Sequence, residues 1–463
     1  MKLQPEMSLE PLYTADEMKR AEAGHDVGEL MERAGRAVAE EAMLRFPDAK
    51  RFVGVCGGGA NGGDGRIALA VLEAAGKAAR TTEEASLAEA DVVIDALFGT
   101  GFHGEPRDEA AGLIEAINAS GKPVVSVDLP SGVDASTGEI AGACVNATVT
   151  VTMHAPKVGL EVAPGRFRAG EVVVADIGLG GVETQHRLVT PAILRLVPRR
   201  SAEQNKYTAG TVLVVGGSRG LTGAPSLAAE AAFRADAGYV AVAVPDSTLP
   251  VFEQRLLEAV KLPCPEEDGA ISPRAIEPIA EFASKAGSLA VGPGLGRGAG
   301  PREVVKRLLA ELDRPTVVDA DGLYDLSPPD RAAPTVLTPH EGELARLLGV
   351  QSSWVAAHRL DAVRRGAENF GCVCLLKGAD TLVAAPGQGV LVVALGTPAL
   401  ATAGSGDVLT GIVAAFLAKG VEARFAAAAA AAAQQLASRS IPQAGAVASD
   451  VAAALPLVLG APV

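Results

Sequence analysis

The sequence predicts an α/β protein with mainly parallel sheets, divided into two domains. A chain of 463 residues exceeds the usual size of one domain and suits two. Short runs of β-branched residues alternate with Ala- and Leu-rich helical stretches along the chain, which is the pattern of strand–helix–strand units. Aromatic residues make up only 3%, so the cores must consist of Val, Leu, Ile and Ala, the residues that buried parallel sheets favour.

The first half is expected to begin with a helix at residues 27–45, where apolar residues recur at the helical spacing. A second helix is expected at residues 66–73, directly after a glycine-rich segment. β-branched runs predict strands at residues 51–56, 91–96, 124–127 and 148–152.

The second half repeats this alternation. Strands are expected at residues 212–215, 240–244, 289–291, 316–318, 336–337, 373–376 and 390–395. The alanine run at residues 426–433 is flanked by Arg424 and Gln434, and we expect a packed helix with close neighbours rather than a membrane span.

The domain boundary is expected within residues 187–206. Residues 194–201 contain a proline and several arginines, a polar stretch follows, and a new strand is expected soon after it. The sequence therefore predicts one domain at residues 1–198 and another at residues 199–463.

Charge and composition argue against several classes of partner. A net charge of −14 without a block of Lys and Arg argues against nucleic acids and anionic membranes, so we expect small-molecule partners. We also expect a homo-oligomer. The cysteine count of 5 is odd and no Cys-x-x-Cys pair occurs, which favours reduced, buried thiols and argues against zinc. Residues 1–6 lack an apolar signal region and no apolar stretch is long enough to cross a bilayer, so we expect a cytoplasmic protein.

Three glycine-bearing loops of the first half follow predicted strands, at residues 56–65, 95–104 and 128–132. Ligands of open α/β sheets bind at the carboxyl ends of the strands, so these loops should converge on a ligand. The first loop leads into a helix, whose free N–H groups suit a pyrophosphate. Asp95 and Asp128 can each be interpreted as turn caps, but three such loops on one sheet favour a binding site.

These loops resemble the NAD(P)H-hydrate epimerase family. The resemblance spans nearly all of residues 10–185 and depends on the motifs at residues 30–35, 61–65, 99–102, 128–132 and 154–160. It implies a Rossmann-like three-layer domain that epimerises the hydrated nicotinamide ring of NADH or NADPH and binds potassium.

The same resemblance implies roles for single residues. It places the potassium ligands at Asn61, Asp95 and Ser131. It places contacts to the hydrate at Ala60, Asn61, Gly62, Gly63, Asp64, Gly99, Thr100, Gly101, Phe102, His103, Gly104, Glu105 and Asp128. Near a bound cation, Asp128 can move a proton to or from the hydrate, and we expect it to be catalytic.

The decisive motif of the second half is Gly-Ser-Gly-Asp at residues 404–407, at the start of an apolar helix expected at residues 408–418. The free N–H groups of such a helix start form an anion hole for a terminal phosphate. Asp407 can accept a proton from a substrate hydroxyl beside that phosphate, as the catalytic base. A helix cap alone would explain Asp407 but not the glycines before it.

Together with the segments at residues 292–296, 338–343 and 377–381, this motif resembles the ribokinase-like superfamily over about residues 200–460. The closer match is the branch of ADP- or ATP-dependent NAD(P)H-hydrate dehydratases. That branch implies hydrate contacts at Ala224, Gly294, His340 and Asp407. It implies nucleotide contacts at Lys377, Gly378, Ala379, Asp380, Thr381, Gly404, Ser405 and Gly406.

Two positions depart from the pattern of that branch. Ser405 stands where many relatives have threonine, and the hydroxyl is kept. Asn205 precedes Lys206 where histidine is expected, which affects only the entry segment of the domain.

The two resemblances predict one bifunctional repair enzyme. The epimerase half would convert the two hydrate epimers into each other, and the dehydratase half would use ADP, with ATP as the alternative, and Mg²⁺ to restore the ring. One alternative is a ribokinase-like kinase of a small alcohol. The other is a non-enzymatic scaffold, which predicts lost site residues or a basic face. The sequence leaves open the choice between NADH and NADPH hydrate.

Overall fold

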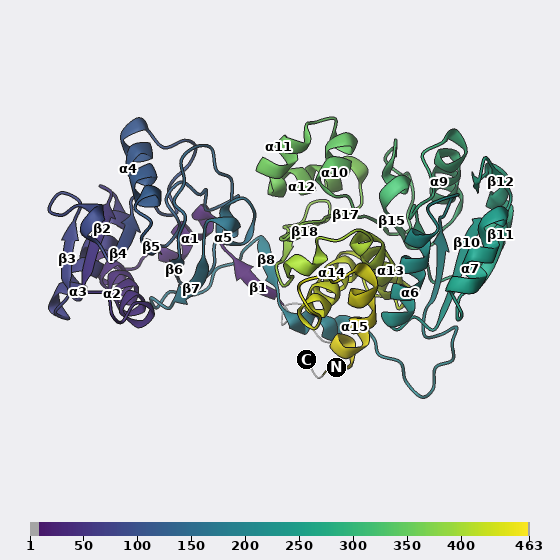
Figure 1. Cartoon of the computed structure of the whole chain (residues 1–463), viewed down its shortest axis with the longest axis horizontal. Coiled ribbons are helices and arrows are strands. Elements are labelled where there is room, and N and C mark those ends of the chain that lie inside the picture. The colour runs from purple at the N-terminus through teal and green to yellow at the C-terminus, as the bar shows by residue number, and fades with distance from the viewer. Residues whose placement is uncertain (1–8, 462–463) are drawn as a thin grey trace. The chain divides into compact units, whose positions relative to one another are not determined.

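The computed structural model describes residues 9–461, which form two compact units (Figure 1). The N-terminal unit contains Pro11–Arg187 together with Ala356–Leu360, and the C-terminal unit contains the rest. The chain thus enters the second unit at Leu188, earlier than the predicted boundary at 198. Apolar residues between the arginines explain this difference, because Ile193 and Leu194 are buried in the core of the C-terminal unit.

The N-terminal unit is built on a six-stranded sheet in the order β3-β2-β4-β5-β6-β7, in which all neighbours are parallel. Its strands are β2 (Arg51–Cys56), β3 (Ala78–Thr81), β4 (Val92–Ala96), β5 (Val124–Val127), β6 (Val149–Met153) and β7 (Glu171–Ala175). The four predicted strands are confirmed to within one residue at each end. Its helices are α1 (Ala15–Glu22), α2 (Val27–Arg45), α3 (Ala60–Ala74), α4 (Asp108–Ala119) and α5 (Val158–Glu161).

Helices cover both faces of this sheet, which confirms the three-layer prediction. Phe52 packs with α2 and α3, whereas its neighbour Val53 packs with α4. Side chains of successive strand residues point to opposite faces, so each strand contributes to both cores. In Figure 1, α4 accordingly lies on the opposite side of the strands from α2 and α3.

Helix α3 begins at Ala60 and not at the predicted Arg66, so the glycine-rich segment is half loop and half helix. Packing explains the error. A Cβ atom at Gly62 would lie 1.9 Å from the carbonyl oxygen of Gly57, and one at Gly65 would lie 2.4 Å from the side chain of Ala96. These glycines allow the first turn of the helix to lie against the strand ends, where only backbone fits.

The C-terminal unit is built on an eleven-stranded sheet in the order β1-β8-β19-β18-β17-β16-β15-β14-β9-β10-β11. Its central strands are parallel, and β17, β18 and β19 pair antiparallel. The strands are β1 (Leu9–Leu12), β8 (His186–Val189), β9 (Thr211–Val215), β10 (Tyr239–Pro245), β11 (Val260–Cys264), β14 (Ser288–Val291), β15 (Thr316–Val318), β16 (Thr335–Leu337), β17 (Val373–Leu376), β18 (Thr381–Ala384) and β19 (Leu391–Val393). A separate two-stranded sheet joins β12 (Glu266–Glu267) and β13 (Ala270–Ile271).

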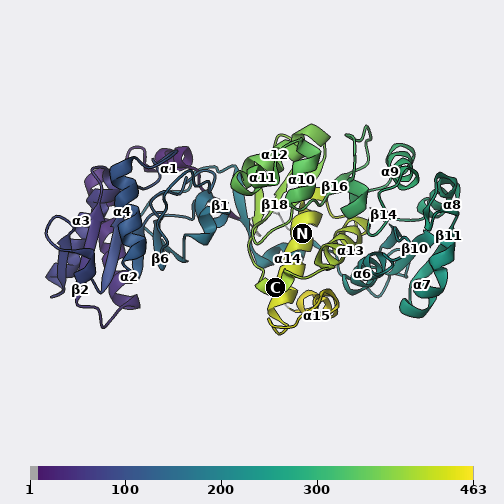
Figure 2. The same ribbon diagram turned by 45° about the horizontal axis from the view of Figure 1, so that its top comes forward.

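Helices again cover both faces of this sheet. They are α6 (Gly223–Arg234), α7 (Leu249–Arg255), α8 (Ile276–Ala283), α9 (Ala299–Glu311), α10 (Glu341–Leu348), α11 (Ser352–Ala357), α12 (Arg359–Phe370), α13 (Ser405–Ala418), α14 (Ala423–Arg439) and α15 (Ala448–Gly460). Side chains of α6, α13, α14 and α15 share one core, and those of α8 and α9 lie in the other. Figures 1 and 2 both show α13 beside α6 and α14.

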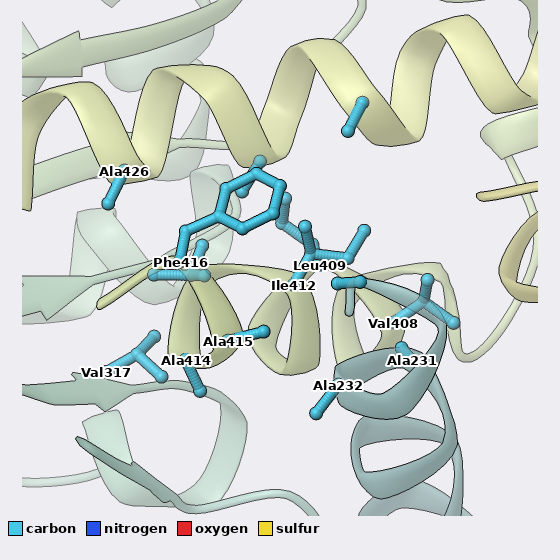
Figure 3. Close-up of a cluster of buried hydrophobic side chains, with 14 of the residues drawn as sticks. Ala231, Ala232, Val317, Val408, Leu409, Ile412, Ala414, Ala415, Phe416 and Ala426 are labelled. Atoms are coloured by element: carbon cyan, nitrogen blue, oxygen red, sulfur yellow. The ribbon is translucent and has the colours of Figure 1, made fainter. Parts of the chain in front are cut away.

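The alanine run lies inside α14, where Ala426–Ala433 are all buried, which confirms the predicted packed helix. Figure 3 shows α14 running past Phe416 and Leu409 of α13, with no bulky residue of its own in the cluster drawn. The short alanine side chains allow the two helices to approach closely. Within residues 9–461, no helix is both long and apolar enough to span a membrane.

Gly411 tests the close contact between α13 and α6. A Cβ atom there would lie 2.1 Å from the carbonyl oxygen of Ala228, so Gly411→Ala must force the helices apart. We expect a loss of about 1–3 kcal/mol in unfolding free energy, measured by hydrogen exchange of the α13 amides. Gly300→Ala in α9 is the control, since its nearest atoms would lie at 3.7 Å, and it should cost nothing. Equal stability of both variants would contradict this account of the packing.

Candidate active sites

The three predicted loops of the N-terminal unit converge on one pocket of about 630 Å³ at the carboxyl ends of β2, β4 and β5. Of the predicted contacts, those that line it are Ala60, Asn61, Asp64, Gly99, Thr100, Gly101, Phe102, His103 and Asp128. Gly62, Gly63, Gly104 and Glu105 are not among its lining residues. Gly62 instead packs against the backbone of Gly57. The structure adds a wall that the sequence did not predict, formed by Met18 and Glu22 of α1 and by Leu30 and Met31 of α2.

Asp128 is held in the pocket by a buried lysine. Its Oδ1 accepts hydrogen bonds from Lys157 Nζ at 2.6 Å, Thr152 Oγ1 at 3.2 Å and Met153 N at 3.2 Å. The Lys157 side chain is fully buried and also donates to Thr152 Oγ1 and to the carbonyl of Met153. Asp128 adopts a φ of 66°, a left-handed conformation that aspartate tolerates better than most residues. The ion pair and the two further hydrogen bonds hold the Asp128 carboxylate in one orientation.

Asp95 lies below the pocket floor, where it is fully buried. Its carboxylate accepts from Ser131 N at 2.9 Å, Ser131 Oγ at 2.6 Å and Ser126 Oγ at 2.8 Å. Burial raises the pKa of Asp95, and these hydrogen bonds oppose the rise.

Asn61 is connected to Asp95 and Ser131 through the loop after β4. Asn61 Nδ2 donates to the carbonyl of Phe98 at 2.9 Å, and Phe98 N donates to Ser131 Oγ at 3.0 Å. The three predicted potassium ligands are therefore joined by one short chain of hydrogen bonds. The described residues contain no cluster of three or more His, Cys, Asp or Glu side chains that could hold a metal ion.

Asp64 differs from the other acidic residues of this pocket. Its Oδ1 is buried and has no hydrogen-bond partner. Burial raises the pKa of Asp64 to about 7, with smaller contributions from the charges of Asp128 and Glu22. Burial and the charge of Asp128 also raise the pKa of Glu22. A carboxyl whose pKa lies at about 7 thus shares the pocket with one that is paired with a buried lysine.

In the C-terminal unit, α13 starts with the turn that the sequence predicts. Gly404 precedes the helix with a φ of 89°, and Asp407 lies in the first helical turn. A Cβ atom at Gly404 would lie 2.6 Å from Leu227, so glycine is required by both conformation and space. The free N–H groups of this helix start lie beside the side chain of Asp407, as an anion site with an adjacent base requires.

A buried network lies beneath this turn. Asp319, at the end of β15, accepts from Lys377 Nζ at 2.8 Å and from Thr410 Oγ1 of α13 at 2.7 Å. Lys377 Nζ also lies 3.6 Å from Glu343. Burial raises the pKa of Asp407 to about 7; the charge of Asp319 adds to the rise and that of Lys377 opposes it. The ammonium group of Lys377, predicted to contact the nucleotide, is engaged by carboxylates here and acts on Asp407 through its charge.

The remaining predicted residues of this unit lie in loops and helix starts that follow its strands. His340 caps α10, where its Nδ1 accepts from Gly342 N at 3.0 Å. Gly294 has a φ of 60° after β14, and Ala224 lies in the first turn of α6. Thr381 donates to the carbonyl of Gly378, which closes the loop before β18.

Several side chains of both sites were not assigned a role from the sequence. Lys157 lies inside the motif at residues 154–160, and Asp319 and Glu343 lie in loops that follow predicted strands, so position alone could have indicated them. Glu22 carries no such signal, because it ends an ordinary amphipathic helix and reaches the pocket only through the tertiary fold.

The comparisons with known proteins agree with this geometry. A family model described as NAD(P)H-hydrate dehydratase matches residues 212–456, and one described as YjeF-related protein N-terminus matches residues 27–83 and 68–159. The bifunctional NAD(P)H-hydrate repair enzyme Nnr of Moorella thermoacetica is 40% identical over 93% of this chain and 92% of its own. The chain belongs to the family of bifunctional NAD(P)H-hydrate repair enzymes.

Other members of this repair-enzyme family are nearly as similar. The enzyme of the same name from Salinibacter ruber is 34% identical over 92% of this chain and 90% of its own. Among solved structures, the ADP/ATP-dependent NAD(P)H-hydrate dehydratase of Bacillus subtilis, co-crystallised with ATP and Mg²⁺, is 28% identical with a TM-score of 0.51. That likeness covers 58% of this chain and 95% of the other. A ribokinase-like superfamily protein of Enterococcus faecalis, 21% identical with a TM-score of 0.51, has the same fold, which confirms the predicted architecture.

The ion pair of the N-terminal pocket can be tested by removing one partner or both. Lys157→Met leaves Asp128 without its counter-charge, and we expect it to cost about 3–5 kcal/mol of stability. Removing the remaining carboxylate as well, in Lys157→Met with Asp128→Asn, should restore much of that loss. Hydrogen exchange of the β5 and β6 amides would measure both variants in the N-terminal unit alone. A double variant no more stable than the single one would show that the charge of Asp128 does not need Lys157.

Proposed function

We propose that this repair enzyme restores hydrated NADH and NADPH by two reactions at two sites. Residues of the N-terminal pocket catalyse the interconversion of the R and S epimers of the hydrate. The site at the start of α13 catalyses dehydration of the S epimer, with ADP as the phosphoryl donor. The observation that carries the proposal is that a chain of this family has both a pocket in which Asp128 is paired with Lys157 and a helix start that holds Asp407.

In the N-terminal pocket, Asp128 removes the proton of the hydrate hydroxyl. Lys157 supports this role because it stabilises the ionised carboxylate from the side buried in the protein. The pocket of about 630 Å³ suits a nucleotide-sized ligand. The start of α3, with Ala60 and Asn61 at the pocket wall, offers N–H groups to its pyrophosphate.

The proposed potassium ion would be held by Asn61, Asp95 and Ser131. Amide, carboxylate and hydroxyl oxygens are the donors that a hard cation prefers, and a fully buried carboxylate such as Asp95 favours a nearby positive charge. Bound there, potassium supplies a fixed charge beside the loops that carry the substrate contacts.

In the C-terminal site, Asp407 removes the proton of the hydroxyl that receives a phosphoryl group. The N–H groups at the start of α13, with Gly404, Ser405 and Gly406, bind the phosphate being transferred. Phosphoryl transfer depends mainly on such positioning and charge stabilisation. The carbon–oxygen bond of the phosphate ester then breaks and phosphate leaves. The neighbouring ring carbon loses a proton, and the double bond of the dihydropyridine ring is restored.

ADP is the proposed phosphoryl donor, with ATP as the alternative, since the Bacillus subtilis relative is described as ADP/ATP-dependent. Mg²⁺ would accompany the nucleotide phosphates. Carboxylates outnumber cations around the turn, where Asp319, Glu343 and Asp407 surround Lys377, and this excess fits a divalent cation.

One chain with both sites has a chemical rationale. Hydration creates two epimers at the carbon that bears the hydroxyl, and a stereospecific dehydratase would leave one of them unrepaired. The epimerase half supplies the missing conversion. A scaffold would not need the polar residues Asn61, Asp64, Asp95 and Asp128 gathered at one edge of the sheet. A kinase of free alcohols would not need the epimerase half.

The two halves can be separated by two single substitutions. Asp407→Asn removes the base of dehydration, and the rate should fall about 10²–10⁴-fold while epimerisation continues. Asp128→Ala should stop epimerisation and spare dehydration of the S hydrate. Absorbance of the reduced nicotinamide, recorded with mixed epimers and ADP, should show complete recovery for the wild type and recovery of the S fraction alone for Asp128→Ala. Full dehydration by Asp407→Asn would remove that residue from the mechanism.

The raised pKa of Asp407 also predicts a pH dependence. A base acts when ionised, so kcat/KM for dehydration should rise as the pH increases through about 7. Asp319→Asn removes a negative charge that raises the pKa of Asp407, so the rise should move to lower pH. A pH profile that is the same in wild type and variant would show that Asp407 does not limit the rate.

A further inference from the structure

The N-terminal pocket contains a second carboxyl group whose situation is unusual for a folded protein. Three buried side-chain nitrogen or oxygen atoms within residues 9–461 have no hydrogen-bond partner, and Asp64 Oδ1 is the only carboxyl oxygen among them. By contrast, Asp128 Oδ1 has three donors and the Asp95 carboxylate is held by two serines. Buried polar atoms are nearly always paired, and a buried carboxylate without a donor is costly. The missing hydrogen bond at Asp64 Oδ1 indicates a functional role in which this oxygen must be free of protein partners.

The surroundings of Asp64 favour its neutral form. It lies in the second turn of α3 and lines the pocket, and α2 presents the apolar side chains of Leu30 and Met31 to the same space. The acidic groups that face it are Asp128 and Glu22, and both raise its pKa. His103 lies at the pocket rim but its Nδ1 bonds to Asp134, at 2.9 Å.

The buried ammonium group of Lys157 is directed to Asp128. Lys157 Nζ donates hydrogen bonds to Asp128, Thr152 and the carbonyl of Met153, and none to Asp64. Lys157 is therefore bonded to Asp128, whereas Asp64 Oδ1 has no donor and burial raises the pKa of Asp64 to about 7. Two carboxyl groups whose environments separate their protonation states are suited to act as base and acid in one reaction.

We propose that Asp64 is the catalytic acid of epimerisation, acting on the hydrate opposite the base Asp128. This inference deepens the proposed function of the N-terminal site and depends on it. Water adds to the enamine of a dihydropyridine so that the hydroxyl is placed on the carbon bonded to the ring nitrogen. That carbon can lose its configuration only if a bond to nitrogen or to oxygen breaks.

The proposed step breaks the bond to nitrogen. Asp128 takes the hydroxyl proton, the O–H electrons form a carbonyl, and the carbon–nitrogen bond opens. Its electron pair goes to the ring nitrogen, which takes the proton of Asp64. Rotation of the open-chain aldehyde then presents its other face. In the reverse step nitrogen attacks the carbonyl carbon and returns its proton to Asp64, while the oxygen recovers the proton held by Asp128. Both carboxyls are regenerated, and no oxidant or reductant is consumed.

Asp64→Asn tests this assignment in the full-length enzyme. The amide has nearly the shape of the carboxyl but cannot supply the proton, so kcat for epimerisation should fall about 10²–10⁴-fold with KM changed only a few-fold. Separated epimers of NADPH hydrate, followed by chromatography without nucleotide, would report epimerisation alone. Dehydration of the S hydrate with ADP should keep the wild-type rate. Glu73→Gln is the matched control, since Glu73 lies on the same helix but is exposed and paired with Arg80, and it should change neither activity.

The pH dependence of the epimerisation rate distinguishes a catalytic role of Asp64 from a structural one, because a structural role would not change this dependence. Because the acid must be protonated, wild-type epimerisation should decline as the pH rises through about 7, and the residual activity of Asp64→Asn should lack this decline. Because the pKa of Asp64 is about 7 in the folded protein and 3.8 in the unfolded chain, the wild type loses stability as the pH rises from about 4 to about 7, and the loss is complete at pH 8. Asp64→Asn should therefore melt at a higher temperature than the wild type at pH 8, which also verifies that it folds.

The outcomes that overturn the proposal are distinct. If the wild type epimerises and Asp64→Asn keeps its kcat and its decline at high pH, Asp64 is not the acid, and the proposed function of the pocket stands. A rise in KM with unchanged kcat would reduce Asp64 to a substrate contact. If the wild type does not accelerate epimerisation while Asp407-dependent dehydration proceeds, the proposed function of the N-terminal site fails, and this inference fails with it.

Discussion

Both sites depend on one constraint: a helix must pack so closely against its neighbours near its start that only glycine fits at the contact. Glycine provides this contact at α3, where Gly62 and Gly65 lie on the backbone of Gly57 and the side chain of Ala96. At α13, Gly404 lies against the side chains of Leu227 and Ala448, and Gly411 lies against the backbone of Ala228 in α6. Because the free N–H groups of a helix lie in its first turn, the two proposed anion sites lie at these helix starts.

The two sites also share an electrostatic arrangement. Each combines a carboxylate that is paired with a lysine and a second carboxyl whose pKa is raised to about 7 by burial. In the N-terminal pocket these are Asp128 with Lys157, and Asp64. In the C-terminal site they are Asp319 with Lys377, and Asp407. The charge of the paired carboxylate adds to the rise in the pKa of its neighbour, so burial and repulsion together bring that pKa close to neutrality.

Sequence reasoning succeeded where a single element carries the signal. The amphipathic pattern gave α2 with both ends correct, and the β-branched runs gave the buried strands, because period and composition are local properties. It failed at the start of α3, where glycines that serve packing were interpreted as a loop. The expected boundary range of residues 187–206 includes Leu188, where the C-terminal unit begins, but the division chosen at residue 198 left the buried residues Ile193 and Leu194 outside that unit.

The sequence by itself determined the family, the two-domain α/β architecture and the segments that approach each ligand, since motifs of adjacent residues carry that information. Only the tertiary structure decided which charges act on one another. Lys157 and Asp128 are 29 positions apart, and Lys377 and Asp319 are 58 apart. The missing hydrogen bond of Asp64 and the arrival of Glu22 at its pocket likewise appear only after folding. A protonation state depends on burial and on the distances between side chains in space. Both quantities are set by the tertiary fold and cannot be obtained from the order of residues.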